Sequence, residues 1–161
     1  MGTLRLKGFE EYEAILSKMK NGTEEIIGKV TYQGAKVIAD EVRKSIQAIP
    51  LVQGYGTAEH PLPGGVTKPQ KDGLLKGFGI SGLQNDGGFY NVKIGFDGYN
   101  SVSTDKYPKG QPNQLVARGC ESGTSWKRKH PFMRPAVTRA KKRAVEAMKK
   151  ACDEACEKTM K

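Results

Sequence analysis

The chain has 161 residues, a length that predicts a single domain with one modest core. Only 37% of the residues are hydrophobic, and 20 glycines with eight prolines indicate long, mobile loops beside the folded part. No apolar run approaches the ~20 residues that cross a bilayer, and the first residues lack the apolar segment of a secretory signal, so we expect a cytoplasmic protein without a membrane partner. In that compartment the three cysteines, Cys120, Cys152 and Cys156, are expected not to form disulfides.

The positive charge is concentrated at the C-terminal end of the chain. Residues 127–161 hold 12 basic and 4 acidic residues, so +8 of the net charge of +10 lies there. This asymmetry predicts an acidic partner for the segment, which could be nucleic acid, an acidic protein face or an anionic surface. The alternative is a solvated basic helix face that only aids solubility.

The first 50 residues are predicted to be mostly helical. A short helix over 9–20 is indicated by apolar residues at spacings of three, four and three, namely Phe9, Tyr12, Leu16 and Met19. Asn21-Gly22 is expected to break this helix, and Asn21 or Thr23 can cap a second one. The second helix is predicted to continue to about Gln47, before Pro50.

The middle of the chain alternates loops with short elements. Asn85-Asp86-Gly87-Gly88 has the composition of a hairpin turn. The elements predicted in chain order are a loop over 51–72, a strand over 74–84, a strand over 89–96, a loop over 97–113, a brief apolar element over 114–120 and a loop over 123–131.

The last helix, over 134–160, is the clearest element. Pro135 suits its first turn, and an alanine-rich stripe then predicts a closely packed partner: Met133, Val137, Ala140, Ala144, Met148, Ala151 and Ala155. Together the elements predict an α+β fold in one domain over 1–161. In this fold a small antiparallel β-sheet carries two long helices on one face, with a short N-terminal helix in addition.

No motif favours catalysis. Gly77-x-Gly79-x-x-Gly82 matches a dinucleotide-binding pattern, but a turn follows where a helix is required, so these glycines are expected to relieve crowding in a strand. Cys120 and His130 could act as nucleophile and base, but nothing indicates a third member or an oxyanion hole. We therefore expect no enzyme activity, no cofactor and no metal site.

Trp126 and the basic residues that follow it form the candidate interaction surface. The ring could stack on a base while the cations bind phosphates. The same residues could equally anchor a protein interface, where Trp and Arg are favoured. The predicted surface comprises Trp126, Lys127, Arg128, Lys129, Arg134 and Arg139.

Two short motifs carry a family resemblance. Glu121-x-Gly123-Thr124 ends the brief apolar element, and Pro131-Phe132-x-x-Pro135-Ala136 opens the last helix. In this order they resemble the tail-component family of long-tailed phages and prophages, whose members act in the neck, in head–tail joining or in tail completion. The loops over 51–72 and 97–113 are longer than is usual in that family, and Arg118-Gly-Cys120 stands where an aromatic residue is more common.

The resemblance implies assembly of a virion. Members of that family form homo-oligomeric rings between head-closure and tail-end proteins, so it implies these partners and a non-specific contact with DNA in the lumen. It also implies synthesis in the host cytoplasm and a final place in the neck or tail end of the virion. The runner-up hypothesis is a small nucleic-acid-binding protein that uses the basic C-terminal segment.

Overall fold

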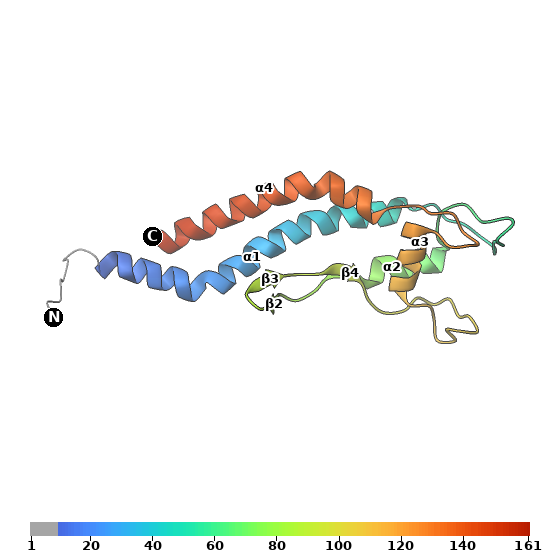
Figure 1. Ribbon diagram of the computed structural model, residues 1–161, viewed down its shortest axis with the longest axis horizontal. Helices are drawn as coiled ribbons and strands as arrows, with labels where there is room; N and C mark the ends of the chain where they lie inside the picture. Colours follow the sequence, from blue (N-terminus) through green and yellow to red (C-terminus); the bar gives the residue numbers. More distant parts are fainter. Residues whose placement is uncertain (1–9) are drawn as a thin grey trace.

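The protein is built on a long pair of antiparallel helices, with two short helices at one end of the pair and the strands extending from there along α1 toward its middle (Figure 1). The computed structural model describes residues 10–161, with side chains from Lys20 onward. The pair consists of α1 (Glu10–Ala48) and α4 (Met133–Met160). The short elements are α2 (Lys68–Gly77), β1 (Phe78–Ile80), β2 (Gln84–Asp86), β3 (Phe89–Asn91), β4 (Ile94–Phe96) and α3 (Asn113–Ser122).

The predicted α+β class is confirmed, with two small antiparallel sheets instead of one. β1 pairs with β4, and β2 pairs with β3. The predicted hairpin turn lies between β2 and β3, where the Asn85 side-chain oxygen accepts the Gly88 N–H at 2.7 Å and Gly87 has φ +65°. The sheets are separate because each predicted strand is interrupted, the first over residues 81–83 and the second over 92–93.

Helix α1 is continuous through Asn21-Gly22, so the predicted break there, and with it the separate short N-terminal helix, is wrong. A glycine inside a helix costs only about 1 kcal/mol relative to alanine. A helix of 39 residues can accommodate that cost when packing against α4 holds much of its length. Gly22 is not required by close packing, because a Cβ there would meet nothing within 4 Å.

The predicted loop over 51–72 and strand over 74–84 are also partly wrong, because residues 68–77 form α2. The helix begins with a capping box. The Thr67 hydroxyl accepts the Gln70 N–H at 3.4 Å, and the Gln70 side-chain oxygen accepts the Thr67 N–H at 3.0 Å. Pro69 lies in the first turn, where its missing N–H has no helical partner to lose. These local bonds outweigh the strand-like pattern of Leu74 and the residues that follow it.

The core lies where the C-terminal half of α1 meets α2, α3 and the start of α4. Its largest fully buried side chains are Val42, Ile46, Ile49, Val66, Leu74 and Cys120. Phe132 is 2% exposed and packs edge-on against Phe96, with 6.1 Å between ring centroids. Phe132 therefore fills the core beneath the start of α4.

Small residues form the seam between α1 and α4. Ala136, Ala140 and Ala144 are buried against α1. A Cβ on Gly34 would stand 2.6 Å from Met148 Sδ, so the glycine allows the two helices to approach closely. The predicted stripe is confirmed at Met133, Ala140 and Ala144, but Val137 is 38% exposed, and the buried residue in that turn is Ala136.

Candidate interaction surface

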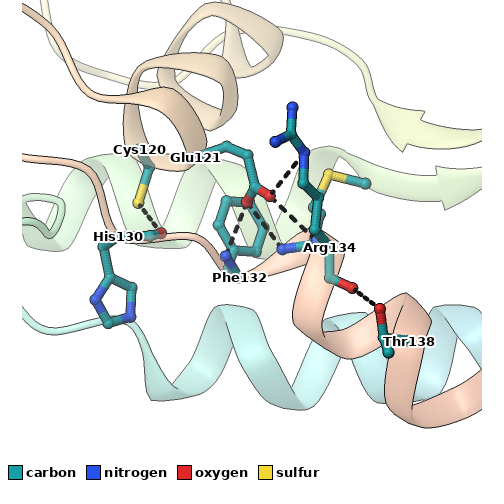
Figure 2. A network of polar contacts seen from close by, with 7 residues as sticks. Cys120, Glu121, His130, Phe132, Arg134 and Thr138 are labelled. Atoms are coloured by element: carbon teal, nitrogen blue, oxygen red, sulfur yellow. Dashed lines mark hydrogen bonds and ion pairs between the residues drawn. The ribbon is translucent and has the colours of Figure 1, made fainter.

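Glu121, at the end of α3, holds the start of α4 (Figure 2). Its Oε2 accepts the backbone N–H groups of Phe132 at 2.8 Å and Met133 at 3.0 Å, and its Oε1 accepts the Arg134 N–H at 3.1 Å. The first N–H groups of a helix have no partner within the helix, and a carboxylate also complements the positive end of the helix dipole. Glu121 therefore caps α4 from outside the helix.

The charge on Glu121 is stabilised by these bonds. Burial alone would raise its pKa, but the three backbone N–H groups and the guanidinium of Arg134 hold the pKa below its ordinary value of 4.5. Arg134 contributes little by itself, because its side chain is 86% exposed and its Nε lies 3.9 Å from Oε1. The cap is thus a charged group at neutral pH.

The loop over 123–131 is hydrogen-bonded to the loop over 51–66. The Leu62 N–H donates to the Trp126 carbonyl, and the Arg128 N–H donates to the Leu62 carbonyl, both at 2.9 Å. Gly56 permits this contact, because a Cβ there would stand 2.0 Å from the Trp126 carbonyl oxygen. The paired loops hold Trp126 with its side chain still 56% exposed.

A cavity of about 700 Å³ lies between α3, the loop over 104–111 and the loop that carries Trp126. We call it the α3 cavity. Three cations line it, Lys106, Arg118 and Lys127, together with the rings of Tyr107 and Trp126. No Asp or Glu is among the described residues that line it. The remaining lining residues are Gln70, Thr104, Gln111, Leu115, Val116, Gly119, Ser122, Gly123 and Thr124.

Lys127 is the most unusual of these cations. It is half-buried, and burial lowers the pKa of its ammonium group. Within residues 20–161 its side chain has no ion pair or hydrogen bond. A half-buried cation without a counter-ion favours an anionic ligand, because such a ligand would replace the water that burial removes.

The structure brings only part of the predicted surface together. Trp126 and Lys127 line the α3 cavity, and Arg128 and Lys129 are exposed beside it in the same loop. Arg139 is held instead against α1, where its Nε donates to Glu41 at 2.9 Å. Arg143 donates to the same carboxylate at 2.9 Å, and the two guanidinium groups lower the pKa of Glu41. The basic charge of α4 is therefore partly neutralised by α1.

Sequence reasoning missed Lys106, Tyr107 and Arg118. These residues lie 8 to 20 positions before Trp126 in the chain. Arg118 lies on α3, whereas Lys106 and Tyr107 reach the cavity because the loop over 97–112 folds back onto α3. In that loop the Asn100 N–H donates to the Gln111 carbonyl at 2.9 Å, and the Asn113 N–H donates to the Gly98 carbonyl at 3.0 Å. No local pattern in the sequence signals this return.

The other motifs have structural roles. Cys120 Sγ donates to the His130 carbonyl at 3.5 Å, and burial raises the pKa of the thiol to about 11. The imidazole of His130 points away from the sulfur (Figure 2), so the two side chains do not form a nucleophile–base pair. Gly77 ends α2 where a Cβ would stand 2.2 Å from the Asp97 carbonyl oxygen, which is a packing role and not a phosphate-binding one.

Two negative findings concern the described part of the chain. Among residues whose side chains are described, no group of three or more His, Cys, Asp or Glu side chains could hold a metal ion. None of the described helices is long and apolar enough to span a membrane.

Comparison with known proteins gave no relative. No family model, no curated protein and no solved structure matches the chain. The resemblance to phage tail components consequently depends on the sequence itself, chiefly on the short motifs at residues 121–136.

Proposed function

We propose that this protein is a structural component of the head–tail joint of a long-tailed phage or prophage, a ring-forming neck or tail-completion protein of the virion. The observation that carries the proposal is the connection between the two motifs. Glu121 of the first motif caps the helix that the second motif opens, and Phe132 of the second fills the core. Residues that looked like scattered matches thus form one structural unit.

The distribution of charge and apolar surface supports an assembly role. Trp126, Leu115 and Tyr99 are exposed large apolar side chains, and Trp126 and Leu115 line a cavity with three cations. Aromatic residues and arginine are favoured in the centre of protein interfaces. A ring component must present complementary surfaces on each copy, so the protein is expected to self-associate.

Loss of the gene tests the proposal. We expect lysates of the deletion mutant to contain filled heads and separate tails, with cell lysis unaffected and joining restored by the wild-type gene in trans. Electron microscopy and plaque counts give the readout. Normal infectious particles from the mutant would show that the protein is not part of the joint.

Nucleic-acid binding is the second candidate, and the charge of +8 on residues 127–161 favours it. A duplex-binding surface with six or more phosphate contacts would lose about 10³-fold or more in affinity between roughly 50 and 200 mM salt. We expect only weak binding in a gel-shift series. We also expect reversal of Lys127, Arg128 and Lys129 to Glu to block head–tail joining in vitro while the fold survives. Tight DNA binding with joining unaffected would favour the second candidate.

A further inference from the structure

A second cavity adjoins the α3 cavity. It has a volume of about 400 Å³ and lies in the loop over 97–112, where it is lined by Tyr99, Lys106, Tyr107, Pro108, Lys109 and Gly110. Lys106 and Tyr107 line both cavities, so the two share a wall. This loop and the loop that carries Trp126 lie at the end of the molecule opposite the C-terminus (Figure 1). We call the α3 cavity and its neighbour the paired cavities.

Three aromatic rings line the paired cavities: Tyr99, Tyr107 and Trp126. Tyr99 is 68% exposed and Trp126 is 56% exposed, so both offer ring surface to a ligand. An aromatic side chain stabilises a fold mainly through the apolar area that it buries, which these two leave largely in water. Their rings are therefore available for stacking, and every base of a nucleic acid has a face that can stack on such a ring.

Four cations line the same walls: Lys106, Lys109, Arg118 and Lys127. The Lys106 Nζ lies 5.7 Å from the centre of the Tyr107 ring, so charge and ring adjoin there. Asp105 is exposed in the same loop, and no Asp or Glu is among the described residues that line either cavity. Within residues 20–161 none of the four cations has an ion pair. Their charge is thus left for an anionic ligand.

We propose that the paired cavities bind a single-stranded nucleic acid, with bases stacked on the exposed rings and phosphates paired with the four cations. Each nucleotide of a strand carries one base and one negative charge, which is the combination that the walls of the cavities repeat. A duplex fits less well, because its bases are stacked on each other and present only their edges. An acidic peptide would pair with the cations but gives no reason for three rings in a row beside them. This inference goes beyond the proposed function and does not depend on it.

Fluorescence of the full chain tests the proposal directly, because Trp126 is its only tryptophan. The probe is an oligothymidylate of about 12 nucleotides, which lies within the range of site sizes of single-strand-binding grooves. Stacking of a base on Trp126 should quench the emission, and the duplex of the same strand should bind more weakly and quench less. Four phosphate contacts predict that the logarithm of the affinity falls with the logarithm of the salt concentration with a slope of about −3, since each contact contributes about 0.7.

Two variants separate the contributions of charge and ring. Arg118→Glu should weaken binding about tenfold or more, because it opposes the phosphates, and should make the salt slope shallower by about 0.7. Tyr99→Leu should weaken binding of the strand about fivefold or more through loss of stacking. Both residues are exposed, so circular dichroism melts of the variants should match the wild type.

The matched controls carry the same chemical changes elsewhere. Lys149→Glu reverses a charge on an exposed position of α4, and Phe89→Leu removes a ring that is 79% exposed on β3. Neither residue lines the paired cavities. Both controls should bind the oligothymidylate as the wild type does.

The inference would be overturned by no binding of the strand, by binding that leaves the emission of Trp126 unchanged, or by a duplex that binds as tightly as the strand. Thymidine monophosphate bound as tightly as the strand would leave a site for one nucleotide only. An oligoglutamate of similar charge that binds equally well, with the same loss in Arg118→Glu, would favour an acidic protein instead. Deletion of the gene tests the proposed function separately, since its outcome does not depend on what the paired cavities bind.

Discussion

Replacing Glu121 with glutamine should destabilise the protein by removing the cap of α4. The carboxylate serves three backbone N–H groups with two oxygens. Glutamine keeps one oxygen, which can serve at most the N–H groups of Phe132 and Met133, and it turns an amide donor toward the Arg134 N–H. Glu121→Gln therefore removes both a hydrogen bond and the charge at the helix N-terminus.

The magnitude follows from these two losses. Loss of a helix cap costs about 0.5–2 kcal/mol, and the helix dipole adds about 0.3–1 kcal/mol for a nearby charge. We expect Glu121→Gln to lower the free energy of unfolding by about 1–3 kcal/mol. For a chain of this length each kcal/mol lowers Tm by about 2–4 °C, so Tm should fall by about 2–12 °C.

The effect should depend on pH in a defined direction. The pKa of Glu121 is lower in the folded protein than its ordinary value of 4.5, so its charged form stabilises the fold. That contribution is fully present above about pH 4.5 and is lost as the pH falls through the lowered pKa. The difference in stability between wild type and Glu121→Gln should therefore be largest near pH 7 and shrink below pH 4.5.

Thermal melts followed by circular dichroism at pH 7 and through pH 3–5 measure the effect. Glu146→Gln is the matched control, because Glu146 is an exposed carboxylate on α4. The control should melt like the wild type at each pH. Equal melting of Glu121→Gln and wild type at pH 7, or a difference that persists unchanged at pH 3, would refute the capping role of Glu121.

Three further predictions concern other parts of the fold. Phe132→Ala removes a ring that is 2% exposed and should lower the free energy of unfolding by about 3–5 kcal/mol. Val137→Ala is the control and should change the denaturation midpoint little, because Val137 is 38% exposed. Equal effects of the two substitutions would place Phe132 outside the core. Cys120 is buried and has its pKa raised to about 11, so it should resist alkylation at pH 8 until the protein unfolds, whereas the exposed Cys152 should react at once. Mass spectrometry of the labelled peptides measures both reactions, and early modification of Cys120 would contradict the prediction. Gly110 has φ +114°, and a Cβ there would stand 2.0 Å from the Asn100 carbonyl oxygen, so Gly110→Ala should lower the free energy of unfolding by about 2–4 kcal/mol. Gly79→Ala is the control and should leave stability unchanged, because a Cβ there would meet nothing within 4 Å. Similar urea midpoints for the two variants would contradict this prediction.

Elements defined by local chemistry could be predicted from the sequence. The last helix followed from Pro135 and the alanine stripe, and the hairpin from Asn85 and Gly87. Helix α2 was missed although its signal is also local. Thr67 and Gln70 form a capping box in a stretch whose glycines and prolines had been interpreted as a continuous loop.

The site was harder to predict because it depends on long-range contacts. Trp126 and Lys127 were identified from their neighbours in sequence, but Arg118 and Lys106 reach the cavity only through the fold. Arg139 was assigned to the same surface, yet it pairs with Glu41, which lies 98 positions away in the chain. Pairing between distant charges decides which part of a basic segment stays free, and composition alone does not contain that information.

The cap formed by Glu121 also fixes the geometry of the distant end of the molecule. Because the carboxylate binds the N–H groups of Phe132 and Met133, it sets the point on α3 from which α4 starts. The close contact between Gly34 and Met148 then allows one register along α1, since a shift by one turn would set larger side chains against each other. The length of α1 left beyond Met160 is a consequence of these two constraints. The cap at the start of α4 and the glycine contact further along it thus fix how the two long helices lie against each other.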